Sequence, residues 1–254
     1  MSNLLTSERM ADIEARLARD GRVVAAELAR LYATSEDTIR RDLRALAADG
    51  RCRRVYGGAL PSTPSTGTVS ARARIAPKAK AALGAAMARL VEPGMSVFID
   101  AGSTTLACAA RLATPATVIT HAPAIAAALV ENEAVRLVTL GGQVDRQVGA
   151  ALGGGVLAAV EAIRPDLLLL GACGIDADAG ITTHSPDDAA LKRAVAARAG
   201  RVAVAADIGK LGTAAPFAVI DLSACDLLLI EAATPSEVRA RFAARGPAII
   251  DVET

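Results

Sequence analysis

Three closely spaced arginines, Arg40, Arg41 and Arg44, could hydrogen-bond to the phosphates and base edges of nucleic acid. Around them, Ile39 and Leu43 recur at the spacing that places apolar side chains on one face of a helix. A helix of this kind can anchor itself in a core through one face and present its arginines to a ligand through the other. Six of the eleven arginines in residues 1–60 fall between positions 40 and 54, so the basic character is local.

The elements that would position these arginines form a helix-turn-helix. Apolar residues at 23, 28, 29 and 31 predict a shorter helix upstream, and Ser35 can cap the free amides of the helix that carries the arginines. In this motif the second helix lies in the major groove of DNA. The residues expected to contact base edges or phosphates are Ser35, Glu36, Thr38, Arg40, Arg41 and Arg44.

The alternative for the arginines is a solvated helix face, which is the more common role of such a pattern taken alone. Arg41 could also pair with Asp37, one helical turn earlier, and so be structural. The upstream helix, the tight turn and the capping serine together favour DNA binding.

A short basic hairpin is predicted directly after the second helix. Charged and bulky residues alternate over positions 51–56 and end at Gly57 and Gly58, as in the wing of a winged helix. Arg53 and Arg54 of this hairpin are expected to contact DNA phosphates.

The first sixty residues resemble the DeoR-type bacterial transcriptional regulators. The resemblance rests on residues 27–29, 35, 38–43, 50 and 54–59, and departs from the usual pattern at Thr34 and Tyr56. It implies an amino-terminal winged helix-turn-helix domain that binds operator DNA.

Length and composition predict two domains joined by a linker. Residues 1–60 form the predicted DNA-binding domain, and the Pro-, Ser-, Thr- and Gly-rich stretch 61–77 forms the linker. Residues 78–254 suffice for a second domain with a large core. Because the chain is 52% hydrophobic with three Phe and no Trp, that core must consist mainly of Ala, Val and Leu.

The second domain is predicted to contain a largely parallel α/β sheet covered by helices on both faces. Continuous apolar runs separated by helical stretches are typical of such sheets. The expected strands are 96–99, 116–119, 135–140, 166–170, 201–205 and 226–230. Ligands of these sheets bind beyond the carboxyl ends of the strands.

Loops after four of these strands carry candidate ligand-binding residues. Residues 100–105 follow the first strand and open a helix, so their amides and hydroxyls could surround a phosphate. A plain strand-to-helix turn is the alternative for that loop alone. Gly141, Gly142 and Gly171 allow close approach of a ligand at two further strand ends, and Lys210 supplies positive charge at a fourth.

The second half also resembles the DeoR family, over residues 80–230. The resemblance implies an effector domain with the fold of ribose-5-phosphate isomerase and glucosamine-6-phosphate deaminase, and a phosphorylated sugar as effector. The residues it implies as contacts are Asp100, Gly102, Ser103, Thr104, Thr105, Gly141, Gly142, Lys192 and Lys210. Asp188 stands where the family usually has Glu, and either contacts the sugar or pairs with Lys192.

Histidines and cysteines give little support for a metal site. His121 is expected either at the pocket rim or as a helix cap, and His184 in an exposed loop. The four cysteines, at 52, 108, 173 and 225, lack metal-ligand spacing and are expected to be buried free thiols in a reducing cytoplasm. We therefore expect no metal and no cofactor.

No membrane association is expected. Charged residues interrupt the first sixteen positions, where a signal peptide would be apolar. The uncharged stretch 112–130 contains Pro115 and Pro123 and predicts a strand, a turn and a helix rather than a membrane span.

The sequence favours a cytoplasmic repressor of carbohydrate catabolism that binds operator DNA as a homodimer or homotetramer. A phosphorylated sugar would release it from the DNA. The alternative is a phosphosugar isomerase or deaminase, but Cys173 and Gly174 stand where the related isomerases carry an acidic pair. A nucleophilic role for Cys173 and a constitutive activator without a ligand are further alternatives.

Overall fold

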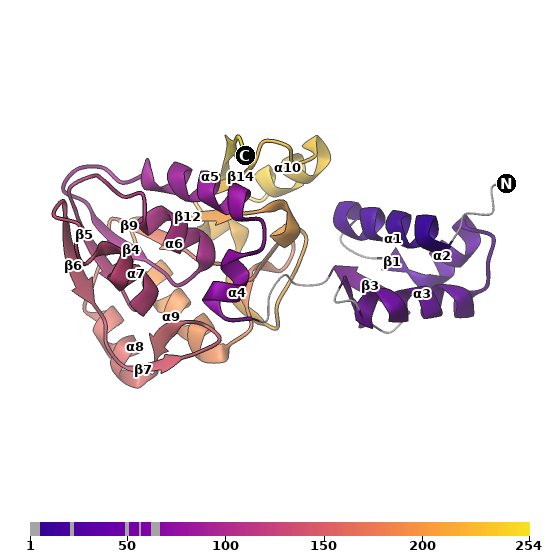
Figure 1. Cartoon of the computed structure of the whole chain (residues 1–254), viewed down its shortest axis with the longest axis horizontal. Helices are drawn as coiled ribbons and strands as arrows, with labels where there is room; N and C mark the ends of the chain where they lie inside the picture. Colours follow the sequence, from indigo (N-terminus) through magenta and orange to yellow (C-terminus); the bar gives the residue numbers. More distant parts are fainter. Residues whose placement is uncertain (1–5, 21–22, 49–50, 56, 62–66) are drawn as a thin grey trace.

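The computed structural model describes residues 6–20, 23–48, 51–55, 57–61 and 67–254 of the 254-residue chain. The elements up to β3 pack around a small core of their own, and those from α4 onward gather around a seven-stranded sheet (Figure 1).

The amino-terminal part is a winged helix-turn-helix, as the sequence predicts. Its core contains Ile13 and Leu17 of the first helix and Ile39, Leu43 and Leu46 of the third. The strands form an antiparallel sheet in the order β1-β3-β2. In chain order the elements are α1 (Thr6–Asp20), β1 (Val23–Val24), α2 (Ala25–Leu31), α3 (Glu36–Ala48), β2 (Cys52–Val55) and β3 (Gly58–Pro61).

Two glycines shape the wing. Gly57 adopts a φ of 81° in the turn between β2 and β3, a conformation that side chains rarely allow. A Cβ at Gly58 would lie 1.9 Å from the carbonyl oxygen of Val23, so only glycine permits β3 to pair with β1. The wing hairpin predicted from the sequence is confirmed in its backbone; Tyr56 lies outside the described residues.

The larger part is built on a fully parallel sheet in the order β15-β14-β12-β9-β4-β5-β6. Its strands are β4 (Ser96–Ile99), β5 (Ala116–Thr120), β6 (Val135–Thr139), β9 (Leu167–Leu170), β12 (Arg201–Ala206), β14 (Leu227–Glu231) and β15 (Ala248–Val252). The helices are α4 (Val69–Ala73), α5 (Pro77–Ala88), α6 (Ser103–Ala109), α7 (Pro123–Leu129), α8 (Gly154–Glu161), α9 (Pro186–Ala196) and α10 (Ser236–Ala243), with short 3-10 turns η1 (Ile208–Lys210) and η2 (Leu222–Ala224).

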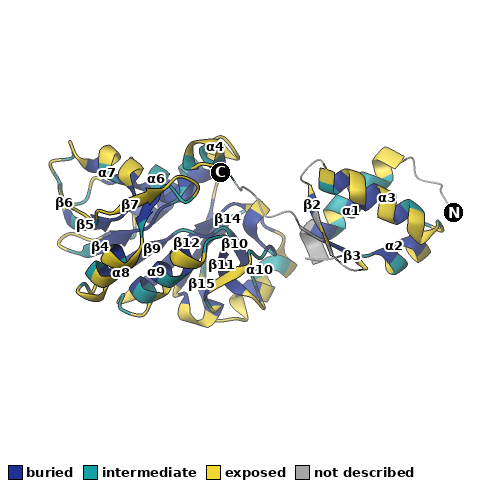
Figure 2. Cartoon of the chain, turned by 90° about the horizontal axis from the view of Figure 1, so that it is seen from below, coloured by how far each residue is buried: buried dark blue, intermediate teal, exposed yellow. Residues whose placement is uncertain are grey.

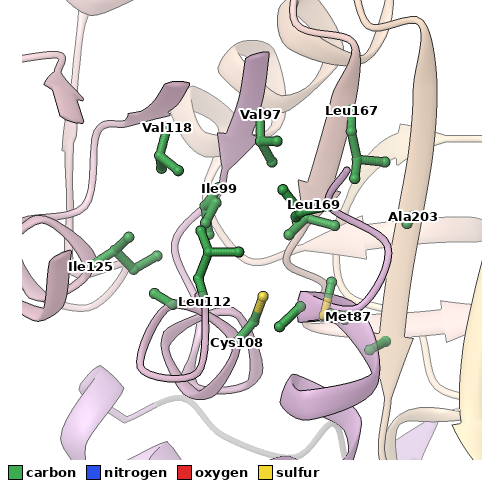
Figure 3. Packing of buried hydrophobic residues seen from close by; sticks show 14 of the residues in the cluster. Met87, Val97, Ile99, Cys108, Leu112, Val118, Ile125, Leu167, Leu169 and Ala203 are labelled. Atoms are coloured by element: carbon green, nitrogen blue, oxygen red, sulfur yellow. The ribbon is translucent and has the colours of Figure 1, made fainter. Parts of the chain in front are cut away.

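Alternate residues of the central strands enter two separate cores. Val97 and Ile99 of β4 pack with residues of α5, α6 and α7, whereas Phe98 packs with residues of α8, α9 and α10. Figure 3 shows the first of these cores, with Met87 and Cys108 facing Leu169. In Figure 2 the sheet is dark blue between helices whose outer faces are yellow. The sheet is therefore covered on both faces, as expected for parallel strands.

Smaller antiparallel elements complete this part and were not foreseen from the sequence. β7 (Gln143–Asp145) and β8 (Ala150–Leu152) form a hairpin, and β10 (Gly174–Asp176), β11 (Gly180–Thr183) and β13 (Phe217–Ile220) form a three-stranded sheet. β15 adds a seventh strand beyond the six expected. The segment 61–77, expected to be a linker, contains α4 and the first residue of α5.

Candidate functional site

The exposed face of α3 carries the arginines that the sequence singles out. Arg40, Arg41 and Arg44 are exposed, while Ile39 and Leu43 on the opposite side are buried. The helix therefore divides as predicted between a core face and a charged face.

The amino-terminal end of α3 is capped by Ser35. The Thr38 amide donates to the Ser35 hydroxyl over 3.2 Å, and the hydroxyls of Ser35 and Thr38 lie 3.0 Å apart. Ala33 in the turn between α2 and α3 has a φ of 52°, a left-handed conformation that costs an alanine about 1 kcal/mol. The capping role expected for Ser35 is confirmed.

The arginines of α3 pair along their own helix. Arg40 donates to Glu36 over 2.7 Å, and Arg41 lies 3.6 Å from Asp37, the pair anticipated from the spacing. All four side chains are at least 45% exposed, so each pair contributes only about 0.3–0.5 kcal/mol and can exchange partners.

The wing adds further positive charge. Arg53 and Arg54 both belong to β2, and Arg54 is exposed. The side chain of Arg53 lies outside the described residues.

Asp42 anchors α3 to α1, a role that sequence patterns did not reveal. Its carboxylate accepts a hydrogen bond from Arg9 over 2.6 Å, and the two side chains are 6% and 12% exposed. An acidic residue between two arginines looks like part of a solvated face. Only the packing of α1 shows that Asp42 turns inward.

A pocket lies at the carboxyl ends of the parallel strands, where the sequence predicted it. Its walls come from the loop after β4, the residues after β9, the hairpin β7–β8, the start of α9, and α4. The lining residues are Gly67, Arg72, Ala101, Gly102, Ser103, Thr104, Thr105, Asp145, Gln147, Val148, Leu170, Gly171, Ala172, Cys173, Thr183, His184, Ser185, Asp188, Lys192, Ala205 and Lys210.

Beneath the pocket floor, Asp100 joins several elements. It accepts hydrogen bonds from Lys192 Nζ at 2.6 Å, His121 Nε2 at 3.0 Å and the Gly171 amide at 2.8 Å. Lys192 also lies 3.4 Å from Asp188. Asp100 is only 1% exposed and does not line the pocket. In the structure Asp100 holds Lys192, His121 and the Gly171 amide together. Its direct contact with the effector stays a prediction.

Electrostatics within this network favours the charged forms. Burial raises the pKa of Asp100, but the charge of Lys192 and the hydrogen bond from His121 outweigh it and lower the pKa to about 2. Burial lowers the pKa of Lys192, but the charges of Asp100 and Asp188 outweigh it and raise the pKa overall. The network is thus a fixed ionic framework under the pocket.

Gly171 is required where two strand ends meet. A Cβ at this position would lie 2.3 Å from the carbonyl oxygen of Ala101 and 2.9 Å from the carboxylate of Asp100. Its carbonyl accepts a hydrogen bond from Lys192 over 2.9 Å. Gly171 therefore lets the loop after β4 approach β9 closely enough to form one wall of the pocket.

Hydroxyls and amides at the start of α6 form that wall. Ser103, Thr104 and Thr105 are all buried and all line the pocket. Thr105 donates to the Gly102 carbonyl over 3.1 Å, whereas the Thr104 hydroxyl is buried without a partner in the described part of the chain. An unsatisfied hydroxyl at the positive end of a helix can donate to an anion.

Lys210 adds a positive charge opposite this wall. It lines the pocket and donates to the Ala172 carbonyl over 2.8 Å. Burial lowers its pKa, against the opposing charge of Asp207. A bound anion would stabilise the charged form of this lysine.

Several sequence expectations about the pocket need correction. His121 was expected at the rim or as a cap, but it is buried between Asp100 and the Ala151 carbonyl. Gly141 and Gly142 are exposed and do not line the pocket. They lie in the loop that leads from β6 to β7, and the chain reaches the pocket only further along the hairpin, at Asp145, Gln147 and Val148.

Among the lining residues that were missed or misplaced, three carry a charged or an imidazole side chain. His184 was expected in an exposed loop, yet it lines the pocket, and its Nε2 is buried without a partner among the described residues. Arg72 comes from the expected linker. Asp145 comes from the unforeseen hairpin β7–β8.

Cysteines follow the expectation except at one position. Cys52, Cys108 and Cys225 are buried free thiols. Cys173 is only partly buried and lines the pocket, 3.5 Å from the hydroxyl of Thr183. Within the described ranges, no cluster of three or more His, Cys, Asp or Glu side chains could hold a metal ion.

No helix in the described part of the chain combines the length and the apolar character needed to cross a bilayer. The stretch 112–130 instead contains β5 and α7, the strand and helix predicted from its prolines.

Comparison with protein families matches both parts of the chain. Residues 9–64 match the DeoR-like helix-turn-helix domain, and residues 75–232 match the DeoR C terminal sensor domain.

Known relatives match along most of the chain. The putative aga operon transcriptional repressor of Escherichia coli O157:H7 is 33% identical, covering 91% of this chain and 88% of the relative. The HTH-type transcriptional repressor GlcR of Bacillus subtilis (strain 168) is 30% identical, covering 88% of each. The glycerol-3-phosphate regulon repressor of Escherichia coli K12 is 28% identical, and the match covers 87% of this chain and 88% of the relative.

Among solved structures, the ribose 5-phosphate isomerase A of Methanocaldococcus jannaschii resembles about half of the chain. The match covers 53% of this chain and 54% of the isomerase, with 16% identity and a TM-score of 0.39.

Proposed function

This chain belongs to the DeoR family of transcriptional regulators, and from that premise we propose that it is a repressor of carbohydrate catabolism genes released from operator DNA by a phosphorylated sugar. Residues 1–60 would read the DNA, 61–77 connect the two functions, and 78–254 bind the effector. The protein would act in the cytoplasm as a homodimer or homotetramer.

The observation that carries this proposal is the presence, in one chain, of an exposed arginine face and of a pocket whose polar groups suit an anion. Arg40, Arg41 and Arg44 on α3 are exposed and supported from behind by a packed core. The pocket combines the ammonium group of Lys210 with the hydroxyl of Thr104, which has no partner among the residues that the structure describes. A DNA reader and an anion sensor in one chain are the two parts that an effector-controlled repressor requires.

DNA reading is assigned to residues at and after the start of α3. Ser35, Glu36, Thr38, Arg40, Arg41 and Arg44 would lie in the major groove, with Arg53 and Arg54 of the wing on phosphates. Because Glu36 and Arg40 are paired in the structure, Arg40 would exchange this partner for a guanine edge or a phosphate.

The phosphate of the effector would bind at the start of α6, against Gly102, Ser103, Thr104 and Thr105, with Lys210 as a charged contact. Asp188 faces the pocket with one carboxylate oxygen buried and unpartnered in the described part of the chain, so it would accept a hydrogen bond from a sugar hydroxyl. Lys192 and Gly171 complete the floor.

Regulation requires that the effector distinguish two arrangements of the protein. A ligand that bound both equally would not shift their populations, however tight its binding. The effector must therefore favour an arrangement in which the α3 helices of an oligomer no longer match the spacing of the operator half-sites.

The test is DNA binding with and without sugar phosphates. The operator sequence is first selected from a random duplex pool with the full-length protein. Its affinity is then measured with ribose 5-phosphate, fructose 1-phosphate, fructose 6-phosphate, glucosamine 6-phosphate and glycerol 3-phosphate, each beside its dephosphorylated parent. At least one phosphate should weaken binding while its parent does not. Binding unaffected by every compound would overturn the proposed effector control.

A further inference from the structure

Arg72 lines the pocket although it belongs to α4, inside the segment expected to be a linker. Its guanidinium donates to the carbonyls of Gln147 at 2.8 Å and Val148 at 3.2 Å, in the loop between β7 and β8. It also donates to the carbonyl of Gly67. One side chain thus joins the connection between the two functional parts to the wall of the pocket.

A second contact seats α4 on the same hairpin. Gly149 has a φ of 78°, and a Cβ there would lie 2.3 Å from a methyl carbon of Val69, so Val69 occupies the space beside it. From the other direction, the buried Lys80 of α5 donates to the carbonyl of Arg72. α4 is therefore held on two sides, and Arg72 is its polar contact with the pocket.

Arg72 still has donors for a ligand. A guanidinium has five N–H donors, and the three contacts with the carbonyls of residues 67, 147 and 148 use three of them. Those acceptors are neutral, and no carboxylate of the described residues forms an ion pair with Arg72. Its remaining N–H groups, on Nε and Nη2, form the edge of the guanidinium that binds phosphate in a bidentate manner.

Two other side chains that line the pocket with Arg72 also bear on its ligand. The Thr104 hydroxyl and His184 Nε2 are buried without hydrogen bonds in the described part of the chain. Both line the same pocket as Arg72, and α4, which carries Arg72, packs against α6, which carries Thr104. Burial lowers the pKa of His184, and the charge of Arg72 lowers it further. An anion in this pocket would meet the Arg72 guanidinium and these two polar groups, which are unsatisfied among the described residues.

We propose that Arg72 binds the phosphate of the effector with its free edge while its other donors hold α4 on the β7–β8 hairpin, so that the effector clamps the connection to the DNA-binding part. This proposal rests on the proposed function and names its coupling residue. The phosphate would bridge the start of α6 and α4, two elements otherwise separate in the sequence.

The contacts of Arg72 with the phosphate add to its contacts with the three carbonyls, because the latter need not break when the phosphate binds. A phosphate adds the attraction between two opposite charges and a bidentate pair of hydrogen bonds to the bonds that Arg72 already makes, so it stabilises the seated position of α4 more than the carbonyls do alone. The effector would therefore bind more tightly when α4 is seated on the hairpin than when it is not. This difference in affinity is what regulation requires.

The test compares Arg72→Gln with Arg74→Gln in the full-length protein. Arg74 is exposed and two residues away, so its variant controls for lost charge on the same segment. The probe is whichever of the five sugar phosphates weakens DNA binding most. By calorimetry, we expect Arg72→Gln to bind it at least tenfold more weakly and Arg74→Gln to bind it normally.

Coupling is measured separately at a probe concentration that saturates each variant. We expect the unaltered protein and Arg74→Gln to lose DNA affinity by at least fivefold, and Arg72→Gln by less than twofold. Ser103→Ala with Thr104→Ala provides the contrast, because it weakens probe binding but leaves the clamp. Once saturated, this double variant should release DNA fully.

Hydrogen exchange separates a clamp from a merely structural arginine. The probe should slow amide exchange over residues 67–76 in the unaltered protein and in Arg74→Gln, but not in Arg72→Gln. A structural role would instead raise exchange in Arg72→Gln equally with and without the probe, and this result would overturn the proposal.

Two further outcomes would overturn it. If Arg72→Gln bound the probe with normal affinity, Arg72 would not be part of the ligand site. If it bound the probe weakly but still released DNA fully at a saturating probe concentration, Arg72 would not couple the effector to DNA binding. Failure of the unaltered protein to respond to any compound would overturn the proposed function itself, a result distinct from any difference between variants.

Discussion

On the exposed face of α3, Arg40 and Arg41 pair with Glu36 and Asp37 of the same helix. Asp100, which follows β4, and Asp188 and Lys192 of α9 are instead almost fully buried. Exposed pairs contribute little to folding and remain free to exchange partners for phosphates. Buried partners cannot be removed singly without leaving an uncompensated charge. The first arrangement suits a reversible contact with DNA, and the second suits a rigid frame for a small ligand.

Breaking the buried frame should give the largest effect. Asp100→Asn removes the charge that Lys192 faces at 2.6 Å, and we expect the free energy of unfolding to fall by about 3–5 kcal/mol. Urea unfolding followed by circular dichroism measures this. Asp187→Asn, at an exposed position on α9, should change it by less than about 1 kcal/mol. Equal effects of the two variants would contradict the distinction between the regions.

Acid should remove part of the same stabilisation. Because the pKa of Asp100 is about 2 in the folded protein and near 3.8 ordinarily, its contribution is complete above the ordinary value and is lost as pH falls from about 4 to about 2. The contribution is on the order of 2 kcal/mol. The gap in unfolding free energy between the unaltered protein and Asp100→Asn should narrow by that amount over this window. A gap constant with pH would mean that Asp100 is not held ionised by the network.

Changes on the DNA face should leave stability intact and weaken DNA binding. We expect Arg40→Ala and Arg44→Ala each to weaken operator binding by about 1–3 kcal/mol if each reads a base. Arg53→Ala or Arg54→Ala should weaken binding to all DNA about equally and reduce its salt dependence. Affinities over a series of salt concentrations decide this, with the exposed Arg164→Ala as a charge-matched control. If all four variants bound the operator as tightly as the unaltered protein, α3 and the wing would not be the DNA-binding surface.

Changes in the pocket wall should affect the response to the effector but not the reading of DNA. Ser103→Ala with Thr104→Ala, or Lys210→Ala, should hold DNA and require at least tenfold more sugar phosphate for release, because several donors share the phosphate. The exposed Lys78→Ala should respond as the unaltered protein does. Release at the ordinary concentration in the pocket variants would contradict the assigned site.

Local patterns in the sequence predicted much of the fold. Apolar periodicity located α3 and six strands of the parallel sheet, because buried strands and amphipathic helices are marked by their own side chains. β15 and the antiparallel pieces escaped prediction, since short or half-exposed strands carry weak signals. The capping serine and the wing were local features as well, and both were found.

The site was harder to predict because its members come from distant segments. Arg72, Asp145 and His184 have no signal of their own, and only the seating of α4 and of the β7–β8 hairpin brings them to the pocket. Conversely, Asp100 and His121 follow strands, as ligand contacts do, yet packing buries both beneath the pocket. A polar residue at the carboxyl end of a strand is therefore a better predictor of a position near the site than of direct contact with the ligand.

The most direct test of the account is the reciprocity between the two regions. Binding of the effector and of operator DNA must each weaken the other by the same factor, which is about 5–150 in typical allosteric proteins. We would measure the dissociation constant of the most effective sugar phosphate by calorimetry, with the full-length protein alone and then saturated with operator DNA. The account predicts weaker effector binding on DNA, by the factor found for DNA release. An effector affinity that is the same with and without DNA would contradict it.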